Sequence, residues 1–296
     1  MTTGPGHPVF RQDYFGDPAA WSALVALLHD TFDIDVGIQD RFGGPDPTSM
    51  PFGYFDADGT CIANFSAFSM SVIIEGRPVK AAGFQSGAVR PQWRGRGLYR
   101  DLMNRAFSRC DAQGFELGLL LTDKPALYEP YGFRVVPQHK FVGSPPPIQP
   151  WTSARRLSLE NADDIDLLKN LLFLNRVPVS ERFAVASQAE MFLLNSFFDG
   201  DVRLDYLEAF DAVAAWKEDA GTVQLLDIAG RAIPLLGDIL AALGVTHEDV
   251  EVCFPPDKLG WQGMPEVHAS GTSLMIRGLP AESLVDPVML SPMAEF

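Results

Sequence analysis

A proline-rich cluster near the middle of the chain constrains the fold more than any other segment. Residues 143–150 read GSPPPIQP. Proline lacks a backbone N–H and fixes φ, so this segment can continue neither a helix nor a strand ladder. We therefore predict one domain at residues 1–143, a linker at 144–150 and a second domain at 151–296. The chain has 296 residues, of which 47% are hydrophobic, which is enough for two such cores.

Both halves show alternating helix and strand patterns. Apolar residues at helical spacing predict a helix at residues 18–32, with Asp17 as its N-cap. In the first half, strands are predicted at 51–55, 61–74, 79–89, 115–121 and 133–142, and helices from Leu98 to near Gly114 and at 125–131. In the second half, helices are predicted at 163–174, 188–198 and 233–243, and strands at 204–210, 213–217, 223–228, 250–254 and 273–276. The predicted fold class is therefore α/β, with mixed sheets of the α+β kind.

The segment 89–99, VRPQWRGRGLY, joins a predicted strand to a predicted helix through a Gly/Arg loop. Backbone N–H groups at such a turn and at a helix start can surround an anion, and Arg94 and Arg96 add charge-assisted donors. Gly95 and Gly97 let the backbone approach a phosphate without a Cβ. The segment matches neither the P-loop pattern nor the full GxGxxG fingerprint. A tight turn with solvent-facing arginines is the alternative interpretation.

A second pattern follows at residues 121–133, LTDKPALYEPYGF. Together, Arg94-x-x-Gly97-x-Tyr99 and the later tyrosine–glycine–phenylalanine signature resemble the two motifs of the GNAT N-acetyltransferases. Tyr99 departs from the glycine or alanine usual at its position, and a reading from Gln92 also satisfies the motif, so the register is ambiguous by two residues. Further details lean towards the enhanced intracellular survival (Eis) branch, which acetylates amines of polycationic or peptidic substrates. The two motifs cover about half of the chain.

The resemblance implies an acetyl-CoA-dependent N-acyltransferase that acts by direct attack of a primary amine in a ternary complex. In that family two strands splay and the pantetheine arm pairs with one of them, here at residues 87–89. The N–H of Val89 would polarise the thioester carbonyl, and Tyr128 would protonate the departing thiolate. The predicted cofactor-binding residues are Ala88, Val89, Arg94, Gly95, Arg96, Gly97, Leu98 and Tyr99. No metal is expected.

Several roles remain open from the sequence. Tyr128 has a structural alternative as a core aromatic, and Tyr131 and Tyr99 are alternative acids. Asp35, Asp123 and Glu129 are candidate general bases. The resemblance to the Eis branch adds the carboxylate of Phe296, for which a frayed tail is the alternative. Four histidines fall in no catalytic pattern, and we interpret them as structural or surface residues: His29, His139, His247 and His268.

Charge and cysteine content limit the classes of partner. The net charge is −15, and residues 151–296 hold 23 of the 38 acidic but only 10 of the 23 basic side chains. This balance argues against nucleic-acid binding and permits a cationic amine substrate, with solubility alone as the simpler explanation. Three widely spaced cysteines predict neither a disulfide framework nor a zinc site and favour the cytoplasm. No signal peptide or transmembrane segment is expected.

The second half repeats the coarse element order of the first, which suggests a diverged GNAT-like domain. Its strand-to-helix junction, residues 227–234, reads DIAGRAIP and holds a single glycine. Asp227 would repel a phosphate there, and Pro234 removes a backbone donor, so one cofactor per chain is expected. Two rival functions remain: a non-catalytic acyl-CoA-binding or regulatory module, and a structural α/β protein that binds nothing.

Overall fold

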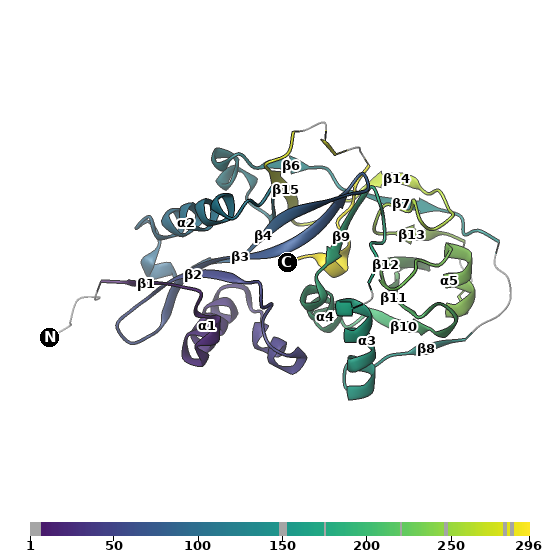
Figure 1. Ribbon diagram of the computed structural model, residues 1–296, viewed down its shortest axis with the longest axis horizontal. Helices are drawn as coiled ribbons and strands as arrows, with labels where there is room; N and C mark the ends of the chain where they lie inside the picture. The colour runs from purple at the N-terminus through teal and green to yellow at the C-terminus, as the bar shows by residue number, and fades with distance from the viewer. Residues whose placement is uncertain are drawn as a thin grey trace. The chain divides into compact units, whose positions relative to one another are not determined.

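The computed structural model describes residues 7–147, 153–174, 176–219, 221–245, 248–280, 283–284 and 287–296 (Figure 1). These residues form two compact units. Unit 1 holds the described residues up to Ser69, together with Lys80–Leu121 and Phe296. Unit 2 holds Met70–Val79 and the described part of Thr122–Glu295. The predicted mixed α/β class is confirmed.

Unit 1 is built on strands β1 to β5, which follow one another in that order across its sheet. Their bounds are β1 Val9–Gln12, β2 Met50–Phe55, β3 Cys61–Ile74, β4 Arg77–Val89 and β5 Leu117–Thr122. β2 is antiparallel to both β1 and β3, whereas β4 and β5 are parallel. A parallel pair needs a crossover connection, and helix α2, Leu98–Ala112, supplies it.

The two helices of unit 1 begin and end where local chemistry predicts. α1 spans Pro18–Phe32, and the carboxylate of Asp17 accepts a hydrogen bond from the N–H of Ala19 at 3.0 Å, as expected of an N-cap. α2 ends before Gly114, which has a φ of 71°. The apolar faces of both helices are buried in unit 1: Trp21, Leu24, Leu27 and Leu28 from α1, and Leu102, Ala106, Phe107 and Cys110 from α2.

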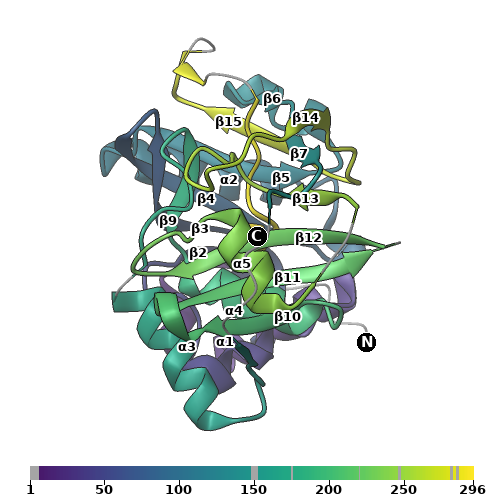
Figure 2. The same ribbon diagram turned by 90° about the vertical axis from the view of Figure 1, so that its right-hand side faces the viewer.

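Unit 2 is built on a seven-stranded sheet in the order β14-β7-β13-β12-β11-β10-β8. Its strands are β7 His139–Gly143, β8 Ala154–Arg156, β10 Arg203–Leu207, β11 Ala212–Asp219, β12 Thr222–Gly230, β13 Val250–Val252 and β14 Met264–Val267. Helices α3 Ala162–Leu174 and α4 Ala189–Phe198 lie on one face, and α5 Leu236–Leu243 lies on the other (Figures 1 and 2). Leu236 and Ile239 of α5 join Leu225 and Val252 of the sheet in one buried core.

One predicted strand is split in the structure. Residues 133–142 form two strands, β6 Arg134–Val136 and β7, separated at Pro137. β6 pairs with β15, Ser273–Arg277, whereas β7 pairs with β13 and β14. Because proline has no N–H to donate, the ladder is interrupted there and the chain changes partners. Lys80–Leu121 belongs to unit 1 and the described part of Thr122–Glu295 to unit 2. Residues 148–150 of the predicted linker lie outside the described residues.

Four strands of the structure were missed from the sequence: β1, β8, β9 and β14. β9, Phe183–Ser187, pairs antiparallel with the end of β3 from Ser71 to Ile74, within unit 2. β8 is a three-residue edge strand that pairs with β10. Strands this short carry too few residues for an alternating pattern to emerge, so only their partners define them.

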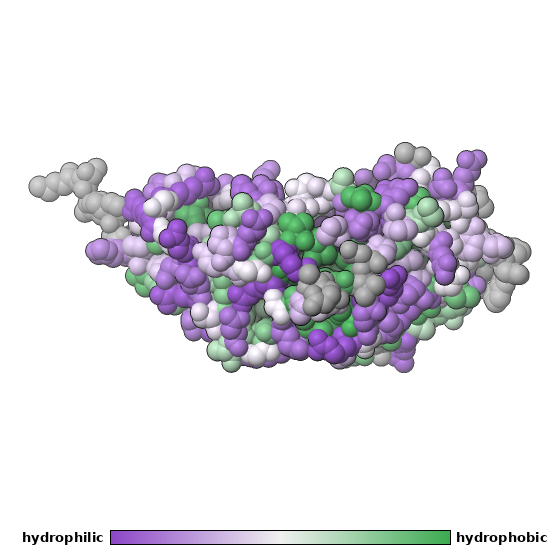
Figure 3. All heavy atoms as spheres, turned by 90° about the horizontal axis from the view of Figure 1, so that it is seen from above, coloured by the Kyte–Doolittle hydropathy of each residue, from purple (hydrophilic) through white to green (hydrophobic). Residues whose placement is uncertain are grey.

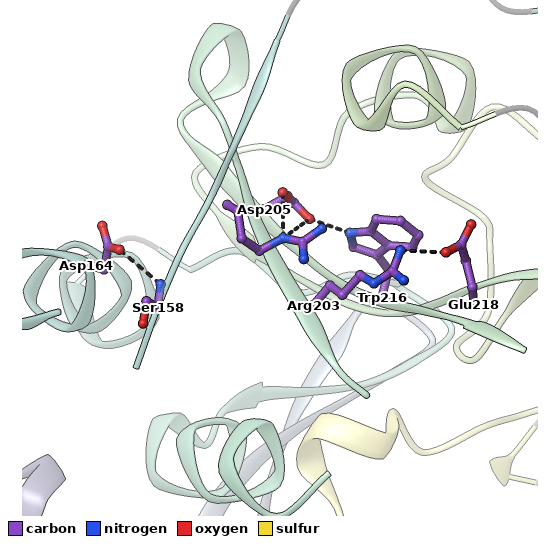
Figure 4. Close-up of polar contacts among 7 residues, drawn as sticks. Ser158, Asp164, Arg203, Asp205, Trp216 and Glu218 are labelled. Atoms are coloured by element: carbon purple, nitrogen blue, oxygen red, sulfur yellow. Dashed lines mark hydrogen bonds and ion pairs between the residues drawn. The ribbon is translucent and has the colours of Figure 1, made fainter. Parts of the chain in front are cut away.

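Polar contacts join three neighbouring strands at one edge of the unit 2 sheet, β8, β10 and β11 (Figure 4). The buried carboxylate of Asp205 in β10 accepts hydrogen bonds from Nε of Arg156 at 3.0 Å and from Nε1 of Trp216 at 2.6 Å. Arg203 pairs with Glu218 at 2.6 Å and lies over the ring of Trp216. Asp205 lies opposite Arg156, and Arg203 lies opposite Trp216, in the strand register. These contacts therefore hold β8, β10 and β11 together.

Candidate functional site

Strands β4 and β5 separate within unit 1. Their parallel register runs from the pair Ala81–Leu117 to the pair Phe84–Leu120. β4 then continues to Val89 and β5 to Thr122, and no further pairing joins them in the described residues. The last five residues of β4, which include Ala88 and Val89, therefore extend beyond their partner. A strand edge without a neighbour offers backbone donors and acceptors to an extended ligand.

The Gly/Arg loop follows this edge and is anchored by one aromatic residue. Trp93 is buried, whereas the four residues after it, Arg94 to Gly97, are exposed. Gly95 and Gly97 have φ angles of 75° and 78°, in the left-handed region where a side chain is strained. Space for a Cβ is open at both positions. The backbone conformation therefore explains why glycine stands at both positions. This reason adds to the one predicted from the sequence, the close approach of the loop backbone to a phosphate.

The loop arginines contact the loop itself. Nε of Arg94 donates to the carbonyl oxygen of Val89 at 3.1 Å, and Nη2 of Arg96 donates to the carbonyl oxygen of Gln92 at 3.2 Å. The guanidinium of Arg96 also lies 4.5 Å from the ring centroid of Trp93. A guanidinium has five N–H donors. Both side chains can therefore order the loop and still bind an anion.

Helix α2 begins without a side-chain cap. Gly97 is its N-cap residue, and the first helical hydrogen bond runs from the N–H of Asp101 to the carbonyl of Gly97 at 3.1 Å. Among the described residues, no hydrogen bond is donated by the backbone N–H of Arg96, Gly97 or Leu98. Unpaired N–H groups at a helix start, combined with the helix dipole, form an anion-binding site. The loop and the helix start therefore suit a phosphate.

Tyr99 does not lie on the loop surface. Its hydroxyl lies against Gly87 of β4, where a Cβ would overlap it, and its ring meets Phe65 edge-on with centroids 5.6 Å apart. The side chain thus packs inside unit 1, which explains how the motif position accepts an aromatic residue in place of glycine or alanine. Only the backbone of Tyr99 remains beside the loop.

Tyr128 belongs to unit 2, whereas the predicted cofactor-binding residues belong to unit 1. It stands between two short 3-10 turns, Pro125–Leu127 and Glu129–Tyr131. The side chain is buried and meets Phe133 edge-on, with ring centroids 6.2 Å apart. Tyr131 is half-buried. This packing is what we expect if Tyr128 is a core aromatic residue. Its role as the general acid stays a prediction.

The candidate bases lie in different surroundings. Asp35 caps a 3-10 turn, accepting from the N–H of Gly37 at 2.9 Å, and Asp123 pairs with the neighbouring Lys124 at 3.2 Å. Glu129 is exposed. Phe296 meets Phe68 edge-on at 5.0 Å between centroids, so this residue is packed and not frayed.

One carboxyl was missed from the sequence. Burial raises the pKa of Glu295 above its ordinary value, and Lys217 opposes this shift in part. Its backbone carbonyl accepts a hydrogen bond from Nδ2 of Asn195 at 2.9 Å. Nothing in the local sequence indicates this burial, because it comes from tertiary packing.

The three cysteines lie away from solvent. All three are buried and free of disulfides. Burial raises the pKa of the Cys61 thiol to about 12 and also raises that of Cys253. Both therefore stay protonated near neutral pH, and a thiol is not the reactive ion.

Unit 2 repeats the strand–helix–strand arrangement of unit 1. β12 and β13 are parallel and are joined through α5, and their register ends at the pair Leu225–Val252 while β12 continues to Gly230. Here the extended part of β12 has partners within unit 2. The hydroxyl of Ser291 donates to the carbonyl oxygen of Leu226 at 3.0 Å and to Asp227 at 2.5 Å. A diverged GNAT-like half, as the sequence suggested, fits this arrangement.

The junction after β12 lacks the features of the unit 1 loop. Asp227 is fully buried and pairs with Arg176 at 2.7 Å, so it faces the core and not a phosphate. At Gly230 a Cβ would lie 2.6 Å from that of Ala212, so close strand packing explains this glycine. Pro234 precedes α5, which begins at Leu236 and not at residue 233.

Unit 2 also has a hollow of about 450 Å³, beside strands β8 and β10 and the end of α4. Its lining includes Arg156, Arg203 and the half-exposed ring of Phe197. Both arginines are paired with carboxylates of neighbouring strands. The hollow therefore presents no unbalanced charge among the described residues, and we assign it no chemistry.

Comparisons with known proteins agree with this arrangement. Residues 24–136 match the acetyltransferase (GNAT) domain family. A probable N-acyltransferase from Enterococcus faecalis is 14% identical with a TM-score of 0.58, over 91% of this chain and 72% of that chain. Eis1 from Mycobacterium abscessus is 14% identical with a TM-score of 0.57, over 90% and 73%. A GCN5-related N-acetyltransferase from Kribbella flavida is 14% identical with a TM-score of 0.54, over 91% and 71%.

The solved structures cover about nine-tenths of this chain. Because they are only 14% identical to it, the similarity shows the fold alone. No curated protein matches the chain. No helix in the described part of the chain has the length and apolar character needed to cross a bilayer. The matched segment contains the separated strands, the Gly/Arg loop and the uncapped helix start. Residues 24–136 of this chain are therefore similar to GNAT acetyltransferase domains in sequence pattern and in fold.

Proposed function

We propose that the protein is an N-acyltransferase that moves an acetyl group from acetyl-CoA to a primary amine in a ternary complex. The separation of β4 from β5, directly before the left-handed glycine loop and the uncapped start of α2, is the observation that carries this proposal. The extended pantetheine arm of CoA needs an open strand edge, and the pyrophosphate at the end of that arm needs backbone N–H donors beside the edge.

The residues of unit 1 suggest how the cofactor is held. The pyrophosphate binds the N–H groups of residues 96–98, and Arg94 and Arg96 balance its charge. The pantetheine arm pairs with the edge of β4 at residues 87–89 as an added strand. The N–H of Val89 donates to the thioester carbonyl and stabilises the oxyanion that forms there.

The reaction needs no covalent enzyme intermediate. The amine nitrogen attacks the thioester carbon, its C–N bond forms, and the amine proton leaves to a base. The C–S bond then breaks, and the hydroxyl of Tyr128 gives its proton to the sulfur. Holding both substrates in one complex supplies much of the acceleration. The assignment of Tyr128 rests on the motif resemblance.

The substrate we propose is a cationic or amine-rich small molecule or peptide. Hydrophilic residues cover most of the face in Figure 3, and the net charge is −15, concentrated after residue 150. Such a field attracts cations and raises their encounter rate.

Binding without turnover is the second candidate function. The loop, the helix start and the β4 edge all lie in unit 1, whereas Tyr128 lies in unit 2. A module that only binds acyl-CoA requires unit 1 alone. Release of free thiol from acetyl-CoA, measured with a panel of amines, separates the two functions: sustained release supports the transferase, and CoA binding with no release on any amine supports the binding module.

A matched glycine pair tests the cofactor site. Gly97 and Gly114 flank α2, have φ angles of 78° and 71°, and both leave open space for a side chain. Gly97→Asp and Gly114→Asp impose similar backbone strain, but only the first places a carboxylate at the phosphate site. In calorimetric titration with CoA, Gly97→Asp is expected to abolish binding and Gly114→Asp to preserve it. Equal affinities in both variants would exclude the loop as the phosphate site.

A further inference from the structure

The backbone of β4 takes an unusual conformation at Ser86. Its φ is 58°, in the left-handed region that side chains rarely adopt. The other described non-glycine residues with positive φ, Asp13, Asp33, Glu75 and Asp211, lie at the ends of helices or in turns, whereas Ser86 lies inside a strand. It stands two residues after Phe84, where the β4–β5 register ends. Strained backbone inside a strand persists only where surrounding contacts hold it.

A buried amide on the neighbouring strand supplies such a contact. Asn64 of β3 is fully buried, and its Nδ2 donates to the carbonyl oxygen of Ser86 at 2.8 Å. Its Oδ1 accepts a hydrogen bond from the hydroxyl of Tyr14 at 2.6 Å, and Ser66 Oγ lies 3.0 Å from Nδ2. Burial raises the pKa of Tyr14 well above its ordinary value, so the phenol stays a donor. The amide orientation is therefore fixed from both ends.

Hydrogen bonds also join the chain to β3 just after the end of β4. The N–H of Arg90 donates to the carbonyl oxygen of Ile62 at 2.9 Å, and Nε of Arg90 donates to that of Cys61 at 2.9 Å. β4 thus stays attached to β3 beyond residue 86 while it leaves β5. A local bend between two attached regions re-aims the residues that follow it, here 87–89.

We propose that Asn64 is a positioning residue for the transfer reaction: by holding the carbonyl of Ser86 it keeps β4 bent away from β5 and sets the edge that receives the acyl thioester. Asn64 acts through the β4 backbone and touches no reacting atom. This inference rests on the proposed function, because the edge has this role only if acetyl-CoA binds there.

Three variants distinguish an effect on the position of the β4 edge from a general loss of fold stability. Asn64→Ala removes the bond to Ser86, whereas Ser66→Ala, the matched control, removes a buried hydroxyl from the same network and leaves that bond intact. Ser86→Gly accepts a φ of 58° without strain and no longer needs the amide. The measurements are CoA affinity by calorimetry, KM and kcat for acetyl-CoA, and the thermal midpoint.

We expect Asn64→Ala to weaken CoA binding about tenfold and to raise KM for acetyl-CoA, whereas Ser66→Ala keeps wild-type affinity despite a lower thermal midpoint. Adding Ser86→Gly to Asn64→Ala should restore the affinity. Equal affinity of Asn64→Ala and wild type, or no rescue by glycine, overturns the inference. Failure of the wild-type protein to bind CoA overturns the proposed function instead.

A substitution at the half-buried Ser86 keeps the test open if Asn64→Ala does not fold. Ser86→Val changes no side chain of the Asn64–Tyr14–Ser66 network, but a β-branched residue disfavours positive φ and favours extended backbone. We expect it to reproduce the loss of CoA affinity and to change hydrogen exchange at residues 87–89 even without CoA. Wild-type affinity and exchange in Ser86→Val would show that the bend does not set this edge.

Discussion

The hydroxyl of Tyr99, on the first turn of α2, occupies the space that a side chain at Gly87 would need. A Cβ at Gly87 would overlap that hydroxyl and lie 3.0 Å from Cζ of the same ring. The helix start and the β4 edge are thus packed against each other through one glycine. This contact couples the predicted phosphate site to the predicted thioester site.

Gly87→Ala should therefore disturb both sites. We expect it to lower the free energy of unfolding by about 1–3 kcal/mol, as overpacking does, and to weaken CoA binding. In a Tyr99→Ala background the same substitution should cost much less, because the obstructing ring is gone. Urea unfolding of the four proteins measures the coupling. Gly16→Ala, where space for a Cβ is open, is the control, and strictly additive effects of Gly87→Ala and Tyr99→Ala would contradict the contact.

Tyr128→Phe tests the proposed acid. The substitution keeps the ring that packs on Phe133 and removes only the proton donor. Turnover should fall about 10²-fold, within the usual range for a general acid, while CoA affinity stays near wild type. Tyr131→Phe, in the same segment, should leave turnover unchanged. Full turnover in Tyr128→Phe, or a loss confined to Tyr131→Phe, would move the role away from Tyr128.

Glu295→Gln should change how stability depends on pH. The folded carboxyl, whose pKa burial raises, holds its proton more tightly than the unfolded chain does. Stability is then lost as the pH rises from the ordinary glutamate range through the folded pKa. The variant removes this loss, so its thermal midpoint should rise relative to wild type as the pH is raised above the ordinary glutamate pKa of about 4.3. The exposed Glu129→Gln serves as control, and a difference independent of pH would refute the expectation.

The chain should bind one CoA. Unit 1 has the Gly/Arg loop, whereas the extended end of β12 in unit 2 contacts Ser291, and Asp227 is buried in an ion pair with Arg176. Among the described residues, this end of β12 has no counterpart to the Gly/Arg loop that would bind a phosphate. Calorimetric titration should give a stoichiometry near one per chain. Two equivalent sites would mean that unit 2 had been misinterpreted.

Salt should lower kcat/KM for a cationic amine. Screening shortens the reach of the negative field that steers such a substrate. The comparison is a cationic and a neutral amine assayed with the same enzyme at increasing ionic strength. Only the cationic amine should lose efficiency. A salt-independent value for both amines, or a preference for anionic amines, would leave the acidic residues a role in solubility alone.

Local chemistry in the sequence was sufficient for much of unit 1. Asp17 and the apolar spacing after it predicted α1, and the glycines and arginines of residues 94–97 predicted the loop before α2. The strand at residues 61–74 was predicted with the bounds of β3. These features depend on residues a few positions apart, so a single sequence contains them.

Tertiary structure decided the rest, because it depends on residues far apart in the chain. Pro137 marks a break in the sequence, but only the sheets show that β6 and β7 pair with strands more than a hundred residues away. Packing between elements likewise produces the burial of Glu295 and the contact of Tyr99 with Gly87. It also produces the hydrogen bond from Asn64 to Ser86. The sequence determined which groups were available for chemistry. Long-range packing determined which of them are desolvated, paired or bent into place.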